Sequence, residues 1–137
     1  VKLLGLFTPV DATGPEMDRA SLMRWLNETM WFPAVWATDL IRWEAIDDTS
    51  AQGTVTAAGI TQAGVFVFDD EGRLTNFRAD RERDVGNGFE MTPWSTPLTE
   101  YEVFDGIELP SRGCGVWSLH DGDFEYIEIQ VTDVEYS

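Results

Sequence analysis

The pattern of apolar and polar positions first predicts one amphipathic helix over residues 15–31. Pro15 fits the first turn, where its missing N–H has no helical partner to lose, and Thr13 with Glu16 fits a capping box. Pro33 ends the helix, because the residue before a proline avoids helical geometry. At the helical period one face carries Leu22, Leu26, Thr29 and Met30, and the other carries Glu16, Arg24, Asn27 and Glu28.

After residue 40 the pattern changes to alternating runs separated by tight turns, which predicts β-strands. The expected strands span residues 40–46, 52–59, 64–68, 73–84, 96–104, 107–119 and 124–136. In the last of these, Ile127, Ile129 and Val131 are expected to face inward. Asp105-Gly106 is the strongest hairpin signal.

Two segments have no firm strand or helix assignment. Residues 2–7 form an apolar run that is either a strand or a helix. Residues 85–95 are interpreted as a glycine loop, 85–88, followed by Thr92-Pro93-Trp94, which either folds back over the core or forms a lid.

The short connections predict antiparallel neighbours, and therefore an α+β fold. We expect a curved antiparallel meander of about six or seven strands, with the N-terminal helix packed on its concave face. The length of 137 residues suits a single domain, residues 1–137.

Charge narrows the classes of partner. Nine basic against 25 acidic residues give a net charge of −16, which disfavours nucleic acids and anionic membranes. Such an acidic surface is typical either of a salt-rich cytoplasm or of ordinary solubility. No membrane-spanning run and no signal peptide is visible, so we predict a cytoplasmic location.

Tryptophans are concentrated early in the chain. Four of the six, Trp25, Trp31, Trp36 and Trp43, lie within residues 25–43. An aromatic side chain buries roughly 150–250 Å² and, for tryptophan, carries an N–H that needs a partner. Two interpretations stay open: an aromatic-lined pocket between helix and sheet, or a filled core or interface.

The first functional hypothesis is a non-enzymatic binding module for an apolar small molecule or lipid. The residues predicted to line its pocket are Trp25, Trp31, Trp43, Phe66 and Trp94. One alternative is a structural or protein-interaction domain with a filled core. Another is a small pocket enzyme that uses a buried carboxylate such as Glu44 or Asp80.

Other candidate chemistry is weak. His120 is the single histidine and lies in a predicted turn, and Cys114 lies between two glycines without a visible activator. The acidic turns lack the ligand spacing of a calcium loop. We therefore predict no metal, no cofactor and no catalytic residue. Arg78, Arg81 and Arg83 form the one basic stretch, which suits either cross-strand ion pairs or contact with an anionic head group.

Several short segments spread over nearly the whole chain carry a resemblance. They are GPEMD (14–18), WFP (31–33), WE (43–44), IDD (46–48), GVF (64–66), FD (68–69), TPW (92–94) and DGDF (121–124). Together they resemble the C-terminal half of an uncharacterised prokaryotic family, a domain of unknown function. The resemblance implies no activity and no catalytic residues.

The architecture that this resemblance implies is similar to that of the half-barrel lipoprotein carriers, in which a curved sheet wraps a helix around an apolar cavity. It also implies an additional N-terminal half in relatives. Without that half, a half-barrel would expose a strand edge and an apolar face. We therefore expect self-association, with a homodimer as the simplest form.

Overall fold

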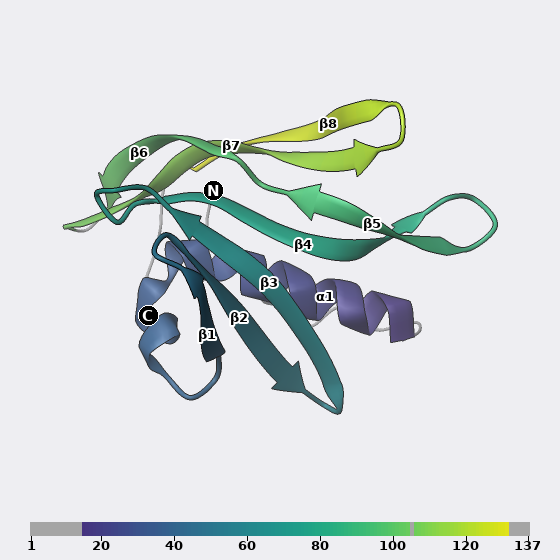
Figure 1. The fold of residues 1–137 in the computed structure, drawn as a ribbon, viewed down its shortest axis with the longest axis horizontal. Helices are drawn as coiled ribbons and strands as arrows, with labels where there is room; N and C mark the ends of the chain where they lie inside the picture. The colour runs from purple at the N-terminus through teal and green to yellow at the C-terminus, as the bar shows by residue number, and fades with distance from the viewer. Residues whose placement is uncertain (1–14, 105, 132–137) are drawn as a thin grey trace.

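The computed structural model describes residues 15–104 and 106–131, and a curved antiparallel sheet dominates this part of the chain (Figure 1). The helical elements are α1 (Pro15–Glu28), η2 (Thr29–Trp31) and η3 (Pro33–Ala37). The strands are β1 (Arg42–Asp47), β2 (Ser50–Ala57), β3 (Ile60–Phe68), β4 (Leu74–Asp84), β5 (Phe89–Ser95), β6 (Leu98–Phe104), β7 (Ile107–Leu119) and β8 (Gly122–Gln130). The predicted run at 2–7, the cap at Thr13 and the strand end at 132–136 lie outside the described residues.

The sheet has the order β1-β2-β3-β4-β5-β7-β6, and β8 pairs with β7. β7 pairs with β5 at Trp117 and Val116 and with β6 from Gly113 to Ile107. β5 and β6 therefore act as two segments of one bent strand that breaks at Thr96 and Pro97. The predicted α+β architecture, an antiparallel sheet with one α-helix, is confirmed.

The predicted number of about six or seven strands is slightly too low, since the described residues alone form eight. The strand that the pattern missed is β5, which was assigned to a loop because of Gly86, Gly88 and Pro93. Pro93 nevertheless pairs opposite Asp80 of β4. β5 meets β7 only at Trp94 and Ser95, so no strand on the other side of Pro93 needs the missing N–H.

The helix region also differs from the predicted single element. α1 ends at Glu28 and the chain tightens into η2 and η3. Thr29 Oγ1 donates to the Leu26 carbonyl at 2.7 Å and accepts from Trp36 Nε1 at 2.9 Å. This hydroxyl thereby joins the last turn of α1 to η3.

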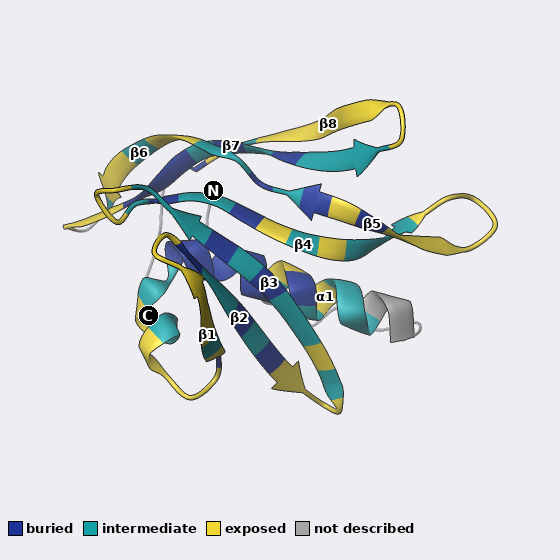
Figure 2. Cartoon of the chain, in the orientation of Figure 1, coloured by how far each residue is buried: buried dark blue, intermediate teal, exposed yellow. Residues whose placement is uncertain are grey.

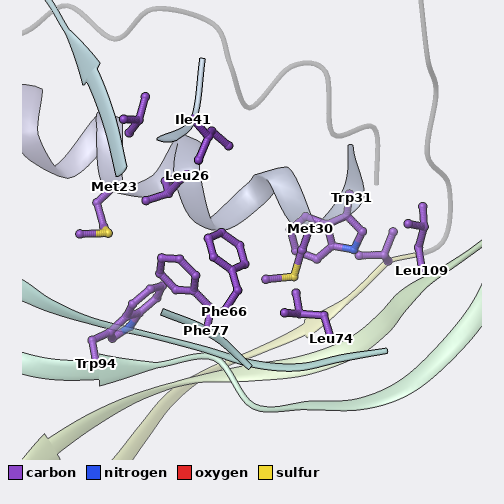
Figure 3. Close-up of a cluster of buried hydrophobic side chains, with 12 residues drawn as sticks. Met23, Leu26, Met30, Trp31, Ile41, Phe66, Leu74, Phe77, Trp94 and Leu109 are labelled. Carbon is purple, nitrogen blue, oxygen red and sulfur yellow. The ribbon is translucent and has the colours of Figure 1, made fainter. Parts of the chain in front are cut away.

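α1 packs chiefly on β3 and also contacts β4 and β2. Figure 2 shows the resulting buried band along the helix and the strands next to it. At its centre Leu26, Phe66 and Phe77 are 0% exposed, and Met23 is 1% exposed. Figure 3 shows the helix methionine and leucine side chains meeting the two phenylalanine rings.

A row of aromatic rings crosses the sheet beneath the helix. Ring centroids lie 5.2 Å apart for Trp43 and Phe66, 4.9 Å for Phe66 and Phe77, and 6.0 Å for Phe77 and Trp94, all edge to face. Glycines make room for these rings. A Cβ at Gly53 would lie 3.1 Å from both Phe66 Cε1 and Trp43 Cζ3, and a Cβ at Gly64 would overlap the Phe77 ring.

The side chains predicted to face inward on the last strand are not all buried. Val131 is 1% exposed and Ile129 is packed against the core, but Ile127 is 46% exposed. Ile127 and Ile129 pair with Gly115 and Gly113 of β7 and therefore share one face of the sheet. Ile127 is exposed because α1 packs on β3, β4 and β2 and leaves this part of the face uncovered.

We predict that Gly64→Ala lowers the free energy of unfolding by about 1–3 kcal/mol, because the new methyl group must displace the Phe77 ring. Gly53→Ala should have a smaller effect, since its neighbours lie 3.1 Å or more away. Urea denaturation measures both. In a Phe77→Leu background the Gly64→Ala effect should shrink, and equal losses in both backgrounds would contradict the proposed clash.

Candidate functional site

The five residues predicted to line a pocket all belong to the core or its border. Trp31, Phe66 and Trp94 are 4%, 0% and 5% exposed, while Trp25 and Trp43 are half-buried against the same cluster. The structure brings Trp43 and Phe66 into contact and links Trp94 to them through Phe77.

Three of these indoles are fixed by hydrogen bonds. Trp31 Nε1 donates to the Pro110 carbonyl at 2.8 Å, and Trp43 Nε1 donates to the Trp36 carbonyl at 2.9 Å. Trp94 Nε1 donates to Tyr126 Oη at 2.9 Å. Packed rings and satisfied N–H groups are what a filled interior requires. That these five residues line a ligand cavity stays a prediction.

Beyond Trp94 the row continues onto strands that the helix does not cover. The paired positions Ala79, Trp94, Trp117 and Phe124 follow one another across β4, β5, β7 and β8. Paired residues share a face of a sheet, so these side chains lie on the face that carries Phe77. Trp117 is half-buried, and Phe124 is 54% exposed.

We name Trp94, Trp117, Phe124 and Tyr126 the aromatic shelf. Tyr126 is 42% exposed and stacks on Trp117 with ring centroids 5.8 Å apart. Its ring has room because β7 has a glycine beneath it, where a Cβ at Gly115 would lie 2.9 Å from Tyr126 Cε1. The yellow of β8 in Figure 2 marks how open this end of the sheet is.

A guanidinium lies over the buried end of the shelf. Arg81 Cζ is 4.4 Å from the centroid of the Trp94 ring. Burial lowers the pKa of Arg81, the like charge of Arg24 lowers it further, and Tyr126 acts in the opposite direction. Within the described part of the chain, no carboxylate forms an ion pair with Arg81.

Other arginines in the structure do have carboxylate partners. Arg19 pairs with Glu82, Arg24 Nε lies 3.8 Å from Glu28 Oε1, Arg73 pairs with Asp69 and Glu71, and Arg112 pairs with Glu100 and Glu128. The sequence interpretation placed Arg81 in a basic stretch with Arg78 and Arg83. Arg78 is exposed, and Arg83 Nε donates to Thr92 Oγ1 at 3.4 Å.

Two open cavities lie near the ends of the sheet. One, of about 460 Å³, lies where β5 and β7 diverge, and Arg83, Met91, Thr92, Pro93 and residues 118–121 line part of it. The other, of about 270 Å³, lies beside Trp36, Phe68 and Tyr101. Arg73 at its rim is held by Asp69 and Glu71, so this guanidinium already has anionic partners.

The carboxyl group with the most perturbed pKa is one that the sequence did not single out. Glu28 was assigned with Asn27 to the polar face of the helix, yet they are 7% and 6% exposed. Burial raises the pKa of Glu28 to about 7 although Arg24 opposes the shift, and Glu28 Oε2 has no hydrogen-bond partner. Asn27 Nδ2 donates to Thr96 Oγ1 at 3.0 Å. Both helix-end residues are therefore covered by tertiary packing, which a helical period does not reveal.

The carboxylates named for an enzyme, Glu44 and Asp80, are both exposed on strands. Burial raises the pKa of the Cys114 thiol, and Glu125 and Glu128 raise it further, so the reactive thiolate is disfavoured. Within residues 15–104 and 106–131, no three His, Cys, Asp or Glu side chains are grouped to hold a metal ion.

This chain is similar to a known protein family over most of its length. A family model matches residues 1–129. The chain belongs to DUF6544, a family of unknown function. This confirms the resemblance inferred from the short segments. No curated protein and no solved structure matched the DUF6544 chain significantly. In the described part of the DUF6544 chain, no helix is long and apolar enough to cross a membrane.

Glu28 makes the stability of the DUF6544 chain depend on pH. Its carboxyl ionises near 4.5 in the unfolded chain and near 7 in the fold. Between these values the unfolded state has released the proton and the folded state has not. Stability contributed by the protonated form is therefore complete below pH 4.5 and is lost as the pH rises to about 7, by about 3 kcal/mol.

We predict that Glu28→Gln removes this loss. The free energy of unfolding of the variant, minus that of the wild type, should rise by about 3 kcal/mol between pH 4.5 and 7.5. Urea denaturation across this range measures the difference, and the exposed Glu44→Gln is the matched control. Parallel curves for wild type and Glu28→Gln would contradict a buried, protonated Glu28.

Proposed function

We propose that this DUF6544 chain is a non-enzymatic binding module for an apolar small molecule, which lies on the aromatic shelf. The observation that carries the proposal is the row of rings on the helix-bearing face that the helix leaves uncovered. Phe124 at 54% and Tyr126 at 42% exposure present aromatic area to solvent, and contiguous exposed apolar area marks binding surfaces.

The shelf is also rigid before any ligand arrives. Tyr126 is held by the Trp117 stack and by the hydrogen bond from Trp94 Nε1. Trp94 in turn packs edge to face on Phe77. A surface that is already ordered loses little conformational entropy on binding, which favours affinity. In this proposal Trp117, Phe124 and Tyr126 contact the ligand, and the buried Trp94 holds Tyr126 in place. Trp25, Trp31, Trp43 and Phe66 support the shelf from the core.

The second candidate is a protein-interaction domain. Exposed apolar side chains occur away from the shelf too, including Val103 at 67% and Ile107 at 42% on the β6–β7 hairpin, and Met91 at 60% on β5. A homodimer formed through such side chains or through a strand edge would bury them. That homodimer stays a prediction.

Tryptophan fluorescence titrated with the neutral dye Nile red tests the binding module. Saturable binding is expected, and Phe124→Ser should weaken it about fivefold, the loss of one aromatic contact of about 1 kcal/mol. Val103→Ser removes an even more exposed apolar side chain elsewhere and should leave the affinity unchanged.

Light scattering on the same samples in high salt separates the two candidates. A 15.4 kDa monomer that binds the dye through Phe124 supports the small-molecule site. A dimer that Phe124→Ser dissociates, with no dye bound by either form, would support the interaction domain instead.

A further inference from the structure

We propose that the ligand of the aromatic shelf carries one terminal anionic group, and that Arg81 receives it. This inference rests on the proposed function and adds the chemical class of the ligand: an amphipathic molecule with an apolar body and a carboxylate or phosphate end.

Arg81 is oriented by its own surroundings. On β4 it pairs opposite Thr92 of β5, two residues before Trp94, and therefore lies on the same face as the shelf. The indole of Trp94 occupies one face of the guanidinium at 4.4 Å. A guanidinium stacked in this way still has its N–H donors at the edge, and an anion that lies in the plane of the group can accept from two of them.

Arg81 is a half-buried cation that has no carboxylate partner within the described residues. With 25 acidic and nine basic residues, carboxylates are abundant, and Arg73 and Arg112 have two each. Arg81 instead has a second guanidinium, that of Arg24, as its charged neighbour. A half-buried positive charge with a like-charged neighbour is unfavourable by itself, and a bound anion would compensate the charge of Arg81.

Besides the N–H groups of Arg81, the hydroxyl group of Tyr126 is a further hydrogen-bond donor beside Trp94. Tyr126 Oη accepts from Trp94 Nε1 at 2.9 Å, so its own O–H proton remains available to donate. Tyr126 also interacts electrostatically with Arg81. An anion at Arg81 can therefore accept from both groups, while the apolar body of the ligand lies along Trp117 and Phe124.

The net charge of −16 favours a free small molecule over the headgroups of an anionic bilayer, since an acidic protein is repelled from such a surface. The cavity beside Trp36 offers no comparable anion site, because Arg73 is already paired there.

Calorimetric titration with dodecanoate and dodecyl phosphate, each below its micellar concentration, and with dodecanol below its solubility limit, tests the inference. The wild type should bind either anion about tenfold more tightly than the alcohol. Arg81→Met should remove that preference and leave dodecanol binding unchanged, and Arg81→Lys should keep part of it. Arg78→Met, an exposed arginine of the same strand, is the matched control.

The outcomes separate this inference from the proposed function. Equal binding of anion and alcohol, with no effect of Arg81→Met, would overturn the anionic end and leave the apolar site standing. No binding of any of the three ligands would overturn both. If Arg81→Met fails to fold, Arg81→Lys takes its place. A weaker preference for the anions over dodecanol in Arg81→Lys than in Arg78→Met would support the inference, and an equal preference in the two variants would overturn it.

Discussion

The packing of two phenylalanine rings into glycine gaps is the constraint on which the rest of the structure depends. Phe66 and Phe77 are 0% exposed with centroids 4.9 Å apart, and Gly53 and Gly64 leave the space they occupy. Because these rings lie low on the sheet, α1 can approach closely enough for Met23 and Leu26 to close over them. Any side chain at Gly64 would lift one ring and, through it, the helix.

The same row of rings connects the core to the open end of the sheet. Trp94 packs on Phe77 on one side and lies beneath Arg81 on another, and its N–H fixes Tyr126. The helix stays over β2–β4, and the Trp31 indole fastens the chain after α1 to the Pro110 carbonyl of β7. The shelf is therefore uncovered because α1 lies over the other strands, while its rings are ordered by the core that α1 completes.

The sequence predicts the parts of this arrangement that depend on local periodicity and turn chemistry. One helix near residue 15, the antiparallel order and most strands follow from alternation and short connections. β5 was missed because Pro93 and the nearby glycines suggest a loop unless the divergence of β5 from β7 is known. The burial of Glu28 and the exposure of Ile127 both depend on which elements cover them in the fold, and tertiary cover leaves no periodic signal in the sequence. Strict alternation from Ile127 and Ile129 places Phe124 on the outward face, and the sequence does not reveal the register shift beside Val116 that brings Phe124 opposite Trp117.

The aromatic shelf has a positive charge, that of Arg81, at its Trp94 end. Carboxylates are abundant in this chain, and one arginine, Arg112, pairs with both Glu100 and Glu128. A carboxylate beside Arg81 would satisfy the guanidinium and leave nothing for a ligand to contact. The Trp94 ring stabilises the cation from its face without occupying its hydrogen-bond donors. Stacking on an indole therefore orders the group and keeps it available, a combination that an internal salt bridge cannot provide.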